Sequence, residues 1–174
     1  MLIFKIIGSF LVISSSAGMG FYFSGELKCR IEDLNELKKL IGLLLGDIRY
    51  ASTPLPEAIS ALARRSSGHF EAFLKNVACK LNELSGATFF EIWKEAVERD
   101  LADTSMTKKD KFQLIQLGEN LGYLDKDMQL NTLDLYLSRL EEEITDLTKT
   151  AKEKTYLFRS LGIMAGVFIS IIMI

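Results

Sequence analysis

The sequence of 174 residues is poor in the side chains from which metal and redox sites are built. It has one histidine, His69, and two cysteines, Cys29 and Cys79, which are far apart and show no CxxC spacing. Metal sites gather several such ligands, so the composition predicts neither a metal nor a cofactor. We expect His69 to be an exposed turn residue. We expect both cysteines to be reduced, with the thiol either packed or reaching out toward solvent, and a disulfide is the alternative.

Signature motifs of enzymes are absent as well. The sequence contains no GxxxxGK[ST], which argues that the chain is not itself a P-loop ATPase. It also contains no HExxH, GxSxG or GxGxxG. The acidic residues are spread over the chain without a catalytic partner. The sequence therefore predicts a protein that binds other proteins and has no enzymatic activity.

Basic excess and strand periodicity are also missing. The net charge is −2 and the pI is about 5.6, whereas a nucleic-acid binder normally carries an excess of lysine and arginine. No segment alternates apolar and polar residues with a period of two, so we expect no strands. The hydrophobic content of 48% is uneven, because both ends are apolar and the middle is charged.

The first apolar end, residues 1–24, predicts a transmembrane helix. Lys5 is its only charged residue, and as a helix residues 2–23 rise about 33 Å, enough to cross the hydrocarbon core. A cleaved signal peptide is the alternative, because residues 14–18 are small as a signal peptidase requires.

The second apolar end, residues 158–174, predicts another membrane helix. Arg159 can extend its charged group back to the interface. Basic residues follow the first segment and precede the second, among them Lys28, Arg30 and Lys152. The positive-inside rule then places residues 25–157 in the cytoplasm and both termini on the opposite side of the membrane.

Residues 25–157 have the periodicity of an all-α domain. Apolar residues at spacings of three and four predict helices over 26–50, 55–65, 69–84, 89–101 and 108–121, and one from 126 into the second membrane segment. We expect an antiparallel helical bundle of about six helices. Thr88 and Glu91 have the spacing of a capping box, and Trp93 is expected to anchor the core. Phe112, Ile115 and Leu121 are expected to face inward.

The last helix carries an apolar seam with the heptad spacing of coiled coils, formed by Leu133, Leu137, Leu140, Ile144, Leu147 and Ala151. This seam packs inside the bundle or pairs with a second copy. The acidic run 141–143 is expected to be a solvated face, with a partner site as the alternative.

Residues 117–125, with the sequence LGENLGYLD, predict a corner between two helices. Gly122 suits the left-handed position that closes a helix, and Asp125 is a good N-cap for the next one. Glu119 is not explained by turn chemistry, because a carboxylate near a helix C-terminus opposes the macrodipole. We expect Glu119 to bridge to the next helix start or to a basic side chain, or to contact a partner.

Several short motifs resemble those of one family. Residues 48–50 (IRY), 53–58 (TPLPEA), 117–122 (LGENLG) with Asp125, and 159–162 (RSLG) occur in the order found in the stage III sporulation protein AB family. The succession of a membrane helix, about 130 helical residues and a second membrane helix is similar too, so the resemblance covers the whole chain.

That family in turn is similar to the cytoplasmic domain of the inner-membrane platform proteins of type II secretion and type IV pilus machines. The corresponding positions here are 55–58, more loosely 86–91, and the corner residues Gly118, Glu119, Gly122 and Leu124. Platform proteins carry two such repeats and more membrane helices. Homo-oligomerisation is therefore an expectation for a chain with one repeat and two anchors.

The resemblance implies a platform subunit of a transenvelope channel complex in endospore formation, located in the mother-cell membrane around the forespore. Its partners would be membrane lipid, other channel subunits and a secretion-type ATPase like stage III sporulation protein AA. A signalling or relay module that uses the long last helix is the alternative. The candidate structural or partner-contact residues are Arg49, Pro54, Glu57, Gly118, Glu119, Gly122 and Asp125.

Overall fold

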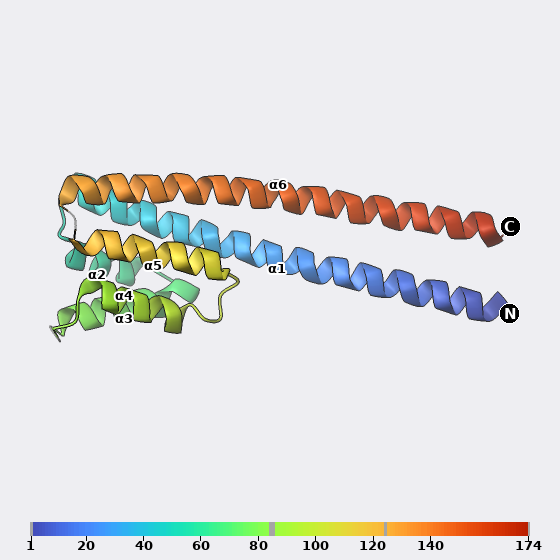
Figure 1. Cartoon of the computed structure of the whole chain (residues 1–174), viewed down its shortest axis with the longest axis horizontal. Coiled ribbons are helices and arrows are strands. Elements are labelled where there is room, and N and C mark those ends of the chain that lie inside the picture. The colour runs from blue at the N-terminus through green and yellow to red at the C-terminus, as the bar shows by residue number, and fades with distance from the viewer. Residues whose placement is uncertain (1, 84–85, 124, 174) are drawn as a thin grey trace. The chain divides into compact units, whose positions relative to one another are not determined.

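The computed structural model describes the backbone of residues 2–83, 86–123 and 125–173, and the side chains of residues 25–83, 86–122 and 125–153. Over this part of the chain it contains six α-helices and no strand (Figure 1). The helices are α1 (Leu2–Tyr50), α2 (Leu55–Arg65), α3 (His69–Asn82), α4 (Phe89–Asp100), α5 (Lys108–Tyr123) and α6 (Lys126–Met173). The all-α class and the helix order agree with the sequence prediction.

The chain divides into two compact units. The first unit joins Met1–Ile31 of α1 to Thr145–Ile174 of α6, which lie side by side (Figure 1). The predicted transmembrane segments 1–24 and 158–174 belong to this unit and lie outside the residues whose side chains are described. Within the described residues, no helix is sufficiently long and apolar to span a membrane.

The second unit, Glu32–Ile144, is a helical bundle. Along the chain, α2 packs on α3, α3 on α4 and α4 on α5. The ends of the unit are joined by ion pairs from α1 to α6, Lys38 to Glu141 at 3.0 Å and Arg49 to Asp134. Because the α1 residue number rises while the α6 number falls, these two helices run antiparallel.

The core of the bundle draws on every helix and is centred on Trp93, which is 1% exposed. Its ring meets Phe73 edge-to-face at 5.0 Å and stacks on Phe89 at 5.5 Å between centroids. The prediction that Trp93 anchors the core is confirmed.

Hydrogen-bonded caps define where α4 and α5 begin. The backbone N–H of Thr88 donates to Glu91 Oε2 at 2.8 Å and the Glu91 N–H donates to Thr88 Oγ1 at 3.3 Å, which confirms the predicted capping box. These bonds hold the pKa of Glu91 below its usual value. A second box joins Thr107 and Asp110, whose carboxylate is buried.

One expectation about side-chain burial was wrong. Phe112 was expected to face inward but is 59% exposed. The buried stripe of α5 passes through Leu114, Leu117 and Leu121, and a residue two positions before Leu114 lies on the opposite side of a helix. Of the two arrangements expected for the cysteines, packed or reaching toward solvent, the structure shows the second, because both are free and exposed.

Gly118 lies directly beneath the Trp93 ring. A Cβ atom built on Gly118 would be 2.1 Å from Cδ1 of Trp93, much closer than any real contact. The indole N–H donates to the Leu114 carbonyl at 2.8 Å, so the ring is held over this turn of α5. Glycine at 118 is therefore what allows α4 and α5 to approach closely.

Gly118→Ala should lower the free energy of unfolding by about 1–3 kcal/mol, the usual cost of an added methyl group in a packed core. Denaturation of the full chain in detergent, followed by its helical circular dichroism, measures this change.

The matched control is Gly42→Ala in α1, where a Cβ would meet no atom within 4 Å. This substitution should raise the free energy of unfolding by about 0.5–1 kcal/mol, because alanine favours helix over glycine. Equal effects of the two substitutions would contradict the packing role of Gly118.

Candidate functional site

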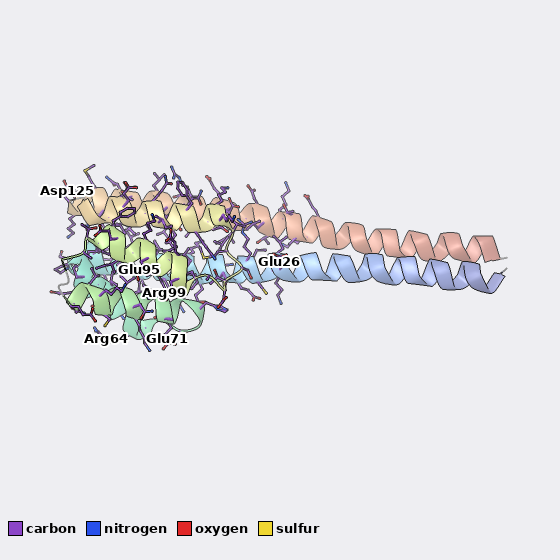
Figure 2. All side chains as sticks on the ribbon, turned by 60° about the horizontal axis from the view of Figure 1, so that its bottom comes forward. Glu26, Arg64, Glu71, Glu95, Arg99 and Asp125 are labelled. Atoms are coloured by element: carbon purple, nitrogen blue, oxygen red, sulfur yellow. The ribbon has the colours of Figure 1, made fainter. Side chains whose placement is uncertain are left out.

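One end of the bundle, which we call the tip, gathers three helix connections. We define the tip as residues 49–57, 83, 86–91, 118–122 and 125–128. Here α1, α3 and α5 end and α2, α4 and α6 begin (Figure 1). Asp125, labelled in Figure 2, marks this end.

Side-chain contacts tie the three connections to one another. The Lys126 ammonium of α6 donates to Ser52 Oγ in the α1–α2 loop at 2.7 Å. A Cβ at Gly122 of α5 would lie 3.4 Å from Phe89 at the start of α4, which is ordinary van der Waals contact. Motifs separated by about 70 residues in the sequence, 48–58 and 117–125, therefore meet at the tip.

The α1–α2 loop has a defined and partly strained conformation. Ser52 has φ of 52°, a left-handed value that is uncommon for a residue with a side chain. The Thr53 N–H donates to the Asp47 carbonyl at 3.2 Å, and the Pro54 carbonyl accepts from Ala58 at 2.9 Å. Pro54 is the N-cap residue of α2 and is exposed. The two ends of the loop are therefore hydrogen-bonded to the helices that it joins.

Two candidate residues flank this loop and differ in their surroundings. Arg49, in the last turn of α1, forms a half-buried ion pair with Asp134 of α6. Glu57 lies in the first turn of α2, where its charge favours the helix dipole, and its side chain is exposed. Arg49 thus joins elements of the bundle, whereas Glu57 is free to face solvent or a partner.

The α5–α6 corner is capped from both sides. Asp125 Oδ1 accepts from the Met128 N–H at 2.9 Å, which confirms the predicted N-cap. The side-chain amide of Gln129 donates to the Leu121 carbonyl at 2.9 Å and satisfies an acceptor in the last turn of α5. Sequence reasoning missed Gln129, and its place four residues after an N-cap was the available signal.

The prediction for Gly122 was wrong. The helix α5 continues to Tyr123, so Gly122 is helical and does not close the helix in a left-handed conformation. In the described residues, the glycines with positive φ are Gly68 and Gly86, in the two turns on either side of α3. Contact with Phe89 is the reason a small residue suits position 122.

Glu119 is exposed in the last turns of α5, next to the buried Gly118. The predicted bridge to the next helix start or to a basic side chain is absent among the residues whose side chains are described. Contact with a partner and a carboxylate that is only solvated are the alternatives to a bridge.

The tip presents groups that can contact a partner. In the side chains that the structure describes, no three His, Cys, Asp or Glu residues are grouped to hold a metal ion. The tip offers exposed carboxylates, proline rings and a tyrosine on a hydrogen-bonded frame. Of the seven predicted residues, Gly118 is buried in the tip and serves packing, and the other six are exposed or half-buried.

Glu119→Ala should leave the melting temperature of the full chain unchanged, because the carboxylate forms no bond within the described part of the chain. Asp125→Ala should lower the stability by about 1 kcal/mol through loss of the N-cap. Thermal unfolding in detergent compares the two variants. A loss for Glu119→Ala as large as that for Asp125→Ala would establish a structural bridge.

Comparison with known proteins identifies the family of this chain. The family model of stage III sporulation protein AB matches residues 5–174. Stage III sporulation protein AB of Bacillus subtilis (strain 168) is 22% identical over 170 residues, which are 97% of this chain and 98% of that protein.

A solved structure of stage III sporulation protein AB has the same fold, with a TM-score of 0.64 and 22% identity over 71% of this chain and 97% of that one. The structural match covers nearly all of the solved chain, and the family model extends almost from end to end of the sequence. The chain therefore belongs to the stage III sporulation protein AB family.

Proposed function

We propose that this chain is a non-enzymatic membrane platform subunit that docks a cytoplasmic motor ATPase onto a transenvelope channel complex during sporulation. The family supplies the sporulation role. The observation that carries the rest is the meeting of motifs 48–58 and 117–125 at the tip, on a frame held by the bond from Lys126 to Ser52. An ATPase like stage III sporulation protein AA is the proposed partner.

The places where α1 enters and α6 leaves the second unit support docking of the ATPase at the tip. Both chain segments that lead out of the second unit leave it at the end opposite the tip. At that end the Ser105 N–H donates to Asp33 of α1 at 2.7 Å, and Lys109 pairs with Glu143 of α6 at 3.0 Å. The tip is thus the end of the second unit farthest from both exits, and we place the ATPase there for that reason.

The proposed location is the mother-cell membrane around the forespore. Residues 1–24 and 158–174 are the proposed anchors, since both are apolar and long enough to cross a bilayer or nearly so. The basic residues that flank them on the side of the middle domain favour a cytoplasmic bundle with both termini across the membrane. We also propose that the chain forms oligomers and contacts other subunits of the channel.

A relay module is the second candidate. One helix, α6, runs without interruption from Lys126 at the tip to Met173 in the second apolar segment. A shift at one end of such a helix is transmitted to the other. If deletion of the gene changed transcription in the forespore while the channel still assembled, this candidate would replace the platform.

Binding to the ATPase tests the proposal. The full chain in detergent should co-purify with its cognate stage III sporulation ATPase and bind it at about micromolar concentration, the affinity of transient complexes. An unrelated P-loop ATPase serves as the specificity control. Absence of binding between two folded partners would contradict the proposal.

Cysteine labelling tests the topology. In a Cys29→Ser, Cys79→Ser background, the exposed Ser67 replaced by cysteine should react with an impermeant maleimide only after cells are permeabilised. In non-sporulating cells that express the chain, where the opposite side of the membrane faces the medium, a cysteine at Leu2 should react without permeabilisation. Labelling at position 67 in intact cells would show that the bundle lies outside.

A further inference from the structure

We propose that the tip docks a basic protein surface containing an apolar pocket, with an acidic rim that steers association and Tyr50 as the anchor. This inference rests on the proposed function, because the occupant it assigns is the motor ATPase. It adds which face of the bundle is used and which chemistry the partner must present.

The charge of the tip is strongly one-sided. It contains six carboxylates, which are Glu57, Glu83, Glu91, Glu119, Asp125 and Asp127, and all six are exposed. Its two cations are both engaged, Arg49 with Asp134 and Lys126 with Ser52. Six carboxylates and two cations give the tip a formal charge of −4, which is larger than the net charge of −2 of the whole chain. A field of this kind accelerates encounter with a positive surface.

Large apolar side chains are exposed inside the same area. Tyr50 is 84% exposed at the end of α1, and Met128 is 53% exposed in the first turn of α6. Tyrosine is among the residues that carry most binding energy at interfaces, because its ring buries a large area with few rotatable bonds. Two of the four large apolar residues that are exposed in the described part of the chain thus lie at the tip.

The backbone that carries Tyr50 is held in place before any partner binds. Ser52, two residues further on, has a left-handed conformation and accepts a bond from Lys126, and Thr53 is bonded to Asp47. Little ordering of this loop is needed on binding, so less of the contact energy is lost. Strain in a loop that is so well bonded is typical of functional sites.

The charge of the tip also decides between possible occupants. A second copy that docks tip to tip would bring two acidic rims together, and like charges in contact oppose association. Nucleic acid and anionic lipid are repelled for the same reason. A basic protein surface is the occupant that matches both the carboxylates and the exposed tyrosine.

Charge reversal at two carboxylates tests the rim. Glu83 and Glu119 lie at helix C-termini, where lysine favours the dipole, so Glu83→Lys with Glu119→Lys should not unfold the chain. Binding of the full chain in detergent to the immobilised ATPase should weaken by at least about tenfold, with most of the loss in the association rate at low ionic strength.

The matched control reverses two exposed carboxylates outside the tip, Glu98 of α4 and Glu142 of α6, to lysine. This variant has the same net charge and should bind within about threefold of the natural chain. Equal loss in both variants would overturn the assigned face.

Tyr50→Ala tests the anchor and should weaken binding by about tenfold, with most of the change in the dissociation rate. Phe112→Ala, which truncates an exposed aromatic far from the tip, is its control and should have no effect. Failure of the natural chain to bind would overturn the proposed function itself. Binding that survives every tip substitution would overturn this inference alone.

Discussion

The packing of the Trp93 ring on Gly118 is the contact on which the arrangement of the bundle depends. The ring fills the space that a side chain at position 118 would occupy, and its N–H is bonded to the Leu114 carbonyl. This contact sets the distance between α4 and α5, and Phe73 and Phe89 pack on the same ring. Because interiors are closely packed, an error of one methyl group here would displace the end of α5.

The tip follows from that arrangement. Once α5 is seated on α4, Gly122 comes against Phe89, and the corner that begins α6 is placed beside the α1–α2 loop. Asp125 and Gln129 then close the corner from the two sides. The residues under the surface serve packing and the residues at the surface are left with exposed charge, which is why Gly118 and its neighbour Glu119 have unrelated roles.

Prediction from sequence succeeded where the cause is local. The capping box of Thr88 and Glu91 and the N-cap at Asp125 depend on bonds within three residues, so spacing alone identifies them.

Prediction failed where the conformation or burial of a residue is set by contacts with another helix. Gly122 looked like a helix end because glycine closes helices, but α5 continues to Tyr123, and Gly122 lies beside Phe89 of α4. Phe112 looked buried because it is aromatic, yet the inward face of α5 is set by Leu114 and its neighbours.

The sequence by itself determined the helical class, the boundaries of most helices and, through short motifs in a fixed order, membership of the stage III sporulation protein AB family. These follow from periodicity and from capping, which act over a few residues. Only the tertiary structure decided that stretches about 70 residues apart form one surface, and that the carboxylates of six separate positions share it with Tyr50. Such a surface arises from the packing of helices against one another, and no local pattern in the chain encodes it.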